Sequence, residues 1–167
     1  NGAETSALDI TDRGLAYGDG LFETMRVLSG RIPLLPLHLA RFAEGVRKLQ
    51  LGHEKKRIAA FKATVKDALK SLSGEALLKV IVTRGSGGRG YSPPEEPACN
   101  IIVQVFDLPQ YLAEYSQSGV VVKACEHRLY HNPVLAGIKH LNRLDQVLAS
   151  KELVEEAEGL LFDQNDL

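Results

Sequence analysis

The sequence has no tryptophan, a single methionine and only two cysteines among 167 residues. Cys99 and Cys125 lie far apart and form no Cys-x-x-Cys pair, so the sequence indicates neither a disulfide framework nor a thiolate metal site. A reducing compartment, the cytoplasm, fits this pattern. No apolar run approaches the ~20 residues that cross a bilayer, and the first residues carry no signal-peptide pattern, so we expect no membrane partner.

An excess of charge of one sign is also missing. The chain has 20 basic and 21 acidic residues and a formal net charge of -1, which argues against a general polyanion binder and predicts no nucleic-acid partner. Its hydrophobic content of 44% is sufficient for a real core, and its length permits one domain or two small ones.

Hydrophobic periodicity predicts a mixed α and β chain. Residues 11–20 are rich in Gly and Asp and predict a loop, and the alternation that follows predicts a hairpin. Within it, Asp19 and Glu23 are expected to cap the loop and to lie on a solvated strand face. The remaining pattern predicts helices at 36–49, 54–72 and 140–156, and strands at 21–28, 32–35, 77–83, 100–106, 119–124 and from 160 onward.

The predicted helix at 36–49 carries an apolar stripe that includes Phe42 and Val46. Arg41 falls away from this stripe, so periodicity alone predicts an exposed residue.

The loop between two predicted strands, residues 84–97, is open to two interpretations. Its glycines free the backbone to approach an anion, and Arg84 and Arg89 add positive charge, which favours a carboxylate or phosphate site. A flexible hairpin tip with solvated arginines is the alternative. A third interpretation is a non-catalytic fragment that binds anions or nucleic acid through Arg84–Tyr91. The loop is not a P-loop, because no Gly-Lys-Ser/Thr follows it.

His127 and His131 have the i, i+4 spacing of a helical metal pair. No Glu follows the first histidine, and Asn132-Pro133 breaks a helix at that point, so we predict local hydrogen bonding and no metal.

Lys139 stands between a Gly-containing turn and a predicted amphipathic helix, which restrains its backbone. An amine is nucleophilic only when neutral, and burial or a neighbouring cation such as Arg143 favours that state. A Schiff-base lysine is one interpretation, and an ordinary solvated lysine is the other.

Four blocks together closely resemble the fold-type IV pyridoxal-phosphate enzymes, in the order found in that family. They are residues 12–24, 35–42, 83–91 and 136–148. The resemblance implies a two-domain α+β or α/β architecture, with a small N-terminal domain at 1–107, a linker at 108–118 and the start of a larger cofactor-binding domain at 119–167.

The resemblance also implies roles for single residues. Lys139 would form the Schiff base with pyridoxal 5'-phosphate and act as general base, Arg41 would hold the phosphate, and Asn142 would meet the cofactor ring. Arg89 and Tyr91 would hold a substrate carboxylate. The loop that carries them often reaches the neighbouring subunit's site in this family, which implies a homodimer.

Within the family, the sequence is most like the lyases that convert 4-amino-4-deoxychorismate to 4-aminobenzoate and pyruvate in folate biosynthesis. A branched-chain or D-amino-acid aminotransferase is the alternative. Similar proteins run on for roughly another hundred residues, so a fragment is expected. The glutamate that serves the pyridine nitrogen would lie about thirty residues past the lysine, beyond Leu167. This chain alone is therefore expected to be a poor catalyst.

Overall fold

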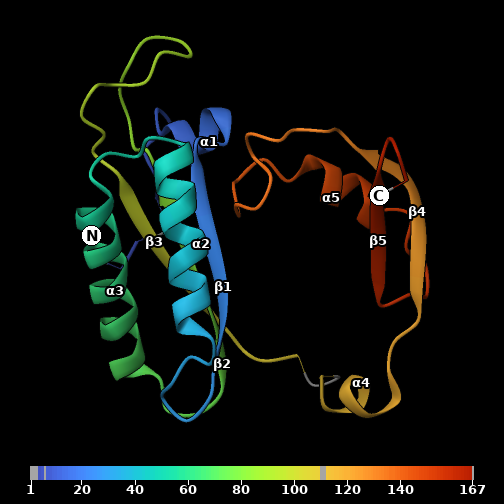
Figure 1. Ribbon diagram of the computed structural model, residues 1–167. Coiled ribbons are helices and arrows are strands. Elements are labelled where there is room, and N and C mark those ends of the chain that lie inside the picture. Colours follow the sequence, from blue (N-terminus) through green and yellow to red (C-terminus); the bar gives the residue numbers. More distant parts are fainter. Residues whose placement is uncertain (1–3, 6, 110–111, 167) are drawn as a thin grey trace. The chain divides into compact units, whose positions relative to one another are not determined.

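The computed structural model describes residues 4–5, 7–109 and 112–166, which form two compact units (Figure 1). The first unit is Asn1–Leu108 with Gly137–Leu141, and the second is Pro109–Ala136 with Asn142–Leu167. The segment that contains Lys139 therefore belongs by its contacts to the first unit, although it lies beyond the predicted linker. No helix in the described ranges is both long and apolar enough to span a bilayer.

The first unit is built on an antiparallel sheet in the order β1-β2-β3. The strands are β1 (Gly20–Val27), β2 (Ala76–Thr83) and β3 (Asn100–Phe106), close to the predicted bounds. Side chains alternate across the sheet. One face buries an apolar set from the first two strands, namely Leu21, Met25, Val27, Leu78, Val80 and Val82.

Two helices, α2 (Leu35–Lys48) and α3 (Glu54–Ser71), cover that apolar face (Figure 1). Their predicted stripes are confirmed, because Phe42 and Val46 of α2 and Phe61 and Val65 of α3 are all buried. The rings of Phe42 and Phe61 meet with centroids 4.5 Å apart. This contact joins the two helices over the sheet.

The region before the sheet differs from the prediction in two places. Residues 11–20 include a short helix, α1 (Arg13–Tyr17), where the Asp12 side chain accepts a hydrogen bond from the Gly14 amide. The returning strand predicted at 32–35 is wrong: Leu28 and Arg31 pair with each other, and α2 begins at Leu35. Pro33 has no N–H to donate, so a sheet ladder cannot continue through it.

The second unit contains α4 (Leu112–Ser118), β4 (Val122–Leu129), α5 (Leu144–Ser150) and β5 (Glu158–Asp163). Strands β4 and β5 are parallel, with an irregular register between Ala124 and Arg128. The predicted linker thus includes a helix, and α5 is shorter than predicted. Beyond it, the Glu152 carboxylate accepts hydrogen bonds from the amides of Glu126 and His127 in β4, a tertiary contact that helical periodicity does not reveal.

Replacing Phe61 by Ala should lower the free energy of unfolding of the first unit by about 3–5 kcal/mol, because it leaves a cavity beneath Phe42. Phe61 is fully buried, whereas Phe106 is 48% exposed and provides the control. Urea unfolding followed by circular dichroism measures both. An effect of Phe61→Ala no larger than that of Phe106→Ala would contradict this account of the core.

Candidate functional site

Lys139 is held against the outer edge of β1 by hydrogen bonds on both sides. The Phe22 amide donates to the Lys139 carbonyl at 2.9 Å, and the Leu141 amide donates to the Gly20 carbonyl at 3.1 Å. His140 lies opposite Leu21 in an antiparallel pair. Because three residues are paired like a short strand, the position of the Lys139 backbone is fixed relative to the sheet.

The Lys139 side chain is half-buried and lies over an aromatic ring. Its Nζ is 4.6 Å from the centroid of the Phe22 ring, and Nζ of Lys79 in β2 is 5.5 Å from the same centroid. A lysine nitrogen at this distance from a ring interacts with its π face. The arrangement presents a primary amine beside an apolar, aromatic surface.

Arg41 is bound to a buried carboxylate. Its Nε and Nη2 donate to Glu23 Oε1 and Oε2 at 2.8 and 2.5 Å, and His38 Nδ1 lies 2.7 Å from Oε2. Hydrogen bonding to Glu23 raises the pKa of the Arg41 guanidinium, and partial burial opposes this with a smaller effect. The side chain of Arg41 is 41% exposed, so it is anchored on Glu23 while part of it faces solvent.

The predicted solvated position of Glu23 is wrong, because its side chain is only 1% exposed. A buried carboxylate is tolerated where hydrogen bonds and opposite charge compensate it. The alternation Leu21-Glu23-Met25 already placed Glu23 on the buried face of β1. His38 and Arg41, one helical turn apart, supply its partners from α2.

Lys139 and Arg41 both depend on β1, through neighbouring residues. Phe22 contacts the lysine and Glu23 binds the arginine, and successive side chains of a strand point to opposite faces. The side chains of Phe22 and Glu23, which contact the two candidate residues, thus leave one strand on opposite faces.

Arg84 is not available to bind an anion, contrary to one reading of the loop. It is 6% exposed, its Nε donates to Asp19 Oδ2 at 2.7 Å, and its two terminal nitrogens donate to the carbonyls of Leu49 and Gln50. Asp19 is equally engaged, because Arg13 Nε also donates to it at 3.1 Å. Asp19, expected as a loop-capping residue, therefore pairs with two arginines, and Arg84 closes the C-terminal end of α2.

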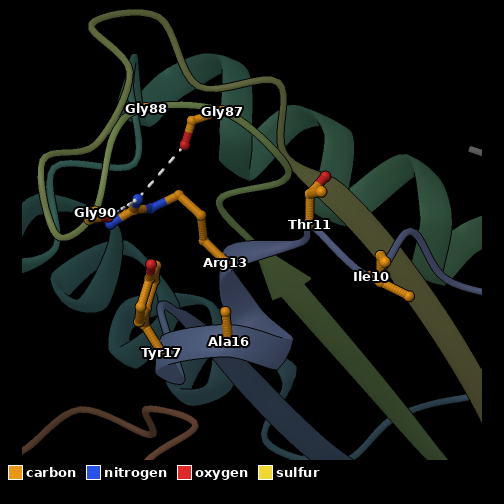
Figure 2. A pocket seen from close by; sticks show the side chains of 8 residues that line it. All are labelled: Ile10, Thr11, Arg13, Ala16, Tyr17, Gly87, Gly88 and Gly90. Atoms are coloured by element: carbon orange, nitrogen blue, oxygen red, sulfur yellow. Dashed lines mark hydrogen bonds between the residues drawn. The ribbon is translucent and has the colours of Figure 1, made fainter.

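Arg89 and Tyr91 lie at the exposed tip of the same loop. Tyr91 is 87% exposed, and its ring centroid is 5.4 Å from that of Tyr17 in α1. Beside this tip is a cavity of about 510 Å³, shown in Figure 2. It lies between α1 and the loop and is lined by Ile10, Thr11, Arg13, Ala16, Tyr17, Gly87, Gly88 and Gly90, so its lining contains neither Lys139 nor Arg41.

The remaining candidates lie in the second unit. Asn142 is exposed and directly precedes Arg143, the N-cap residue of α5, rather than lying in the first helical turn as predicted. His127 Nε2 is 2.9 Å from Asp145 Oδ1. Within the described ranges, no group of three His, Cys, Asp or Glu residues is arranged to hold a metal ion.

The sheet with its two covering helices, the lysine paired to β1 and the arginine of α2 define a known class of protein. Residues 20–167 match the model of the amino-transferase class IV family, so the chain belongs to this family. Enzymes of this family use pyridoxal phosphate as cofactor. The predicted fold-type IV architecture is thereby confirmed.

Among its relatives are enzymes of one particular kind. The chain is 34% identical over 156 residues to aminodeoxychorismate lyase of Vibrio harveyi, covering 92% of this chain and 55% of the relative. It superposes on the crystal structure of 4-amino-4-deoxychorismate lyase from Pseudomonas aeruginosa with a TM-score of 0.90 and 44% identity, covering 99% of this chain and 60% of that one.

A third solved structure, the pyridoxal-phosphate-bound form of a hypothetical aminotransferase from Mycobacterium tuberculosis, shares the fold. Its TM-score is 0.71 at 21% identity, and the match covers 96% of this chain and 58% of that one. The chain thus spans a little over half the length of these proteins.

The residues present fit pyridoxal phosphate. The cofactor's aldehyde forms a Schiff base with a primary amine, and the Lys139 Nζ lies over the apolar ring of Phe22. The cofactor's phosphate suits a permanent cation, and the Arg41 side chain is anchored on Glu23 and partly exposed.

Replacing Glu23 by Gln should lower the free energy of unfolding by about 1–3 kcal/mol, because the buried acceptor of the Arg41 guanidinium loses its charge. Glu75→Gln is the matched control, because Glu75 pairs with Arg26 at the surface with both side chains about half exposed. That pair should contribute about 1 kcal/mol or less. Denaturant unfolding compares the two variants, and equal losses would contradict the role assigned to Glu23.

Proposed function

We propose that the whole protein is a pyridoxal-phosphate-dependent lyase that converts 4-amino-4-deoxychorismate to 4-aminobenzoate and pyruvate, a step of folate biosynthesis. The observation that carries this proposal is Lys139, whose backbone is paired with β1 and whose amine lies over the Phe22 ring. The 44% identity to the Pseudomonas aeruginosa lyase supports the choice of reaction.

Three residues would hold the cofactor. Lys139 would attach through its amine, Arg41 would bind the phosphate through its guanidinium, and Asn142 would meet the ring. When bound, the cofactor supplies an aldehyde that amines add to and a conjugated ring that accepts an electron pair.

Lys139 would also serve as general base. In the cofactor-loaded protein its amine would remove the proton from the carbon that bears the substrate's nitrogen. The C–O bond at the adjacent carbon would then break to release the enolate of pyruvate, and the ring would become aromatic. The ring loses one proton and the enolate gains one, so the reaction needs no oxidant or reductant.

Arg89 and Tyr91 would bind a carboxylate of this substrate, which has two. Both side chains are exposed at the loop tip, so they are accessible to a ligand. An arginine suits the task because its planar fork matches a carboxylate. We further propose a cytoplasmic homodimer in which this loop serves the neighbouring subunit's site.

The same lysine would also serve a branched-chain or D-amino-acid aminotransferase, which differs only after proton removal. The family includes aminotransferases, and this is the second candidate. Incubating the whole protein with 4-amino-4-deoxychorismate should produce the fluorescence of 4-aminobenzoate. Formation of keto acids from amino acids, without that fluorescence, would instead establish the aminotransferase.

Borohydride reduction of the cofactor-loaded protein should bleach its yellow colour and attach the cofactor covalently to Lys139. Lys139→Ala should lower kcat by at least about 1,000-fold, because the base and the attachment point are both lost. Peptide mass spectrometry after reduction identifies the modified residue. An unmodified Lys139 peptide from fully loaded protein would rule out the assignment, and Lys79→Ala shows whether the second lysine at Phe22 can substitute.

Arg41→Lys should weaken cofactor binding by roughly tenfold or more, because lysine keeps the charge but lacks the fork that binds Glu23 and phosphate together. Arg47, exposed on the same helix and paired with Glu44 and Glu54, provides Arg47→Lys as control. Titration of the apoprotein followed by the cofactor's absorbance measures the affinity. Equal affinities for both variants would remove Arg41 from the phosphate site.

A further inference from the structure

Arg13 is a buried arginine that no part of the proposed reaction uses. We propose that it is a positioning residue, which fixes loop 86–92 so that Arg89 and Tyr91 can hold a substrate carboxylate. The substrate-holding role of the loop rests on the proposed function. The contacts by which Arg13 fixes the loop do not depend on that function.

The charge of Arg13 is compensated inside the protein. Its side chain is 6% exposed, and its Nε donates to Asp19 Oδ2 at 3.1 Å. The same carboxylate oxygen accepts from Arg84, which ties Asp19 to the end of α2. The guanidinium of Arg13 is therefore held at a fixed place beneath the loop, and its remaining nitrogens are directed to other acceptors.

Those acceptors are backbone carbonyls on both sides of the loop tip. Nη1 donates to Gly90 at 2.9 Å and makes longer contacts with the carbonyls of Gly87 and Ser92, at 3.5 and 3.4 Å, and Nη2 donates to Tyr91 at 2.9 Å. Figure 2 shows the guanidinium between Gly87 and Gly90. A single buried side chain thus contacts the chain before and after Arg89.

The loop needs such an external restraint. Gly85, Gly87, Gly88 and Gly90 all have positive φ angles, between 57° and 118°. Glycine loses more conformational entropy on ordering than any other residue, so the three glycines within residues 86–92 raise the cost of ordering this loop. Inside the loop the Ser92 amide donates to the Arg89 carbonyl at 3.2 Å, and the carbonyl contacts with Arg13 add to this backbone hydrogen bond.

The contacts with Arg13 also set the direction of the loop side chains. Since the carbonyls of Gly90 and Tyr91 turn inward to the guanidinium, the side chain of Tyr91 is directed outward and is 87% exposed. Its ring rests against Tyr17, whose own ring lies 4.8 Å from the Arg13 guanidinium carbon. Arg13 donates to Asp19 and to carbonyls of the loop, so the role assigned to it is to position the loop.

The test uses the whole, cofactor-loaded protein with Arg13→Met and Arg13→Lys. Arg84 remains to pair Asp19 in both variants, so the carboxylate is not left alone. Arg26→Met is the control, because Arg26 is half exposed and pairs with Glu75 at the surface. Hydrogen exchange of residues 86–92, steady-state kinetics and the cofactor absorbance are measured together.

We expect amide exchange in the loop to accelerate at least about tenfold in Arg13→Met, with exchange in α2 and α3 unchanged. The KM for 4-amino-4-deoxychorismate should rise about tenfold while kcat stays within about threefold and the cofactor absorbance is retained. Arg13→Lys should show the same pattern to a smaller degree, because one ammonium group cannot donate to all four carbonyls. If Arg13→Met does not fold, the exchange and kinetics of Arg13→Lys test the positioning role of Arg13.

Unchanged loop exchange in a folded variant would overturn the role of Arg13, whatever the protein's reaction. Faster exchange with unchanged KM would show that the loop does not hold the substrate. A wild-type protein without lyase activity would overturn the proposed function and the substrate-holding role with it, and the exchange data would still report whether Arg13 fixes the loop.

Discussion

The backbone pairing of residues 139–141 with the edge of β1 is the constraint on which the candidate site depends. It brings a lysine from beyond the second unit's first strand back to the sheet of the first unit. Two backbone hydrogen bonds set the place of the lysine, and the Phe22 ring sets the surroundings of its amine. Without this pairing, Lys139 would be an ordinary residue of a connecting segment.

Strand β1 combines this function with a second one. Its odd-numbered residues form the apolar face beneath α2 and α3, and Glu23 is the one charged member of that face. The cost of burying the carboxylate is offset by His38 and Arg41, which are thereby held in place. A core position thus orients a cation that remains partly exposed, and the stability of the unit and the geometry of the proposed phosphate ligand are linked.

Four arginines of the first unit divide into two groups by burial. Arg13 and Arg84 share Asp19 and donate to backbone carbonyls, so they hold α1, the end of α2 and the glycine loop together. Arg41 and Arg89 keep part of their surface in solvent and are the proposed ligand contacts. An arginine in the sequence can therefore be a structural residue or a candidate binding residue. Its hydrogen-bond partners in the folded protein distinguish the two.

The sequence by itself determined the elements of the first unit. Strand alternation and the helical stripes with Phe42 and Phe61 are local patterns, and burial of their apolar side chains stabilises the elements that they predict. It also determined the family, through four blocks that no single motif would specify. Only the tertiary structure decided that Glu23 pairs with Arg41, that Arg84 is buried, that α5 ends before Glu152, and that Lys139 joins the first unit. Each of these depends on a partner distant in the chain, and hydrogen bonds and ion pairs between distant residues leave no periodicity from which they could be read.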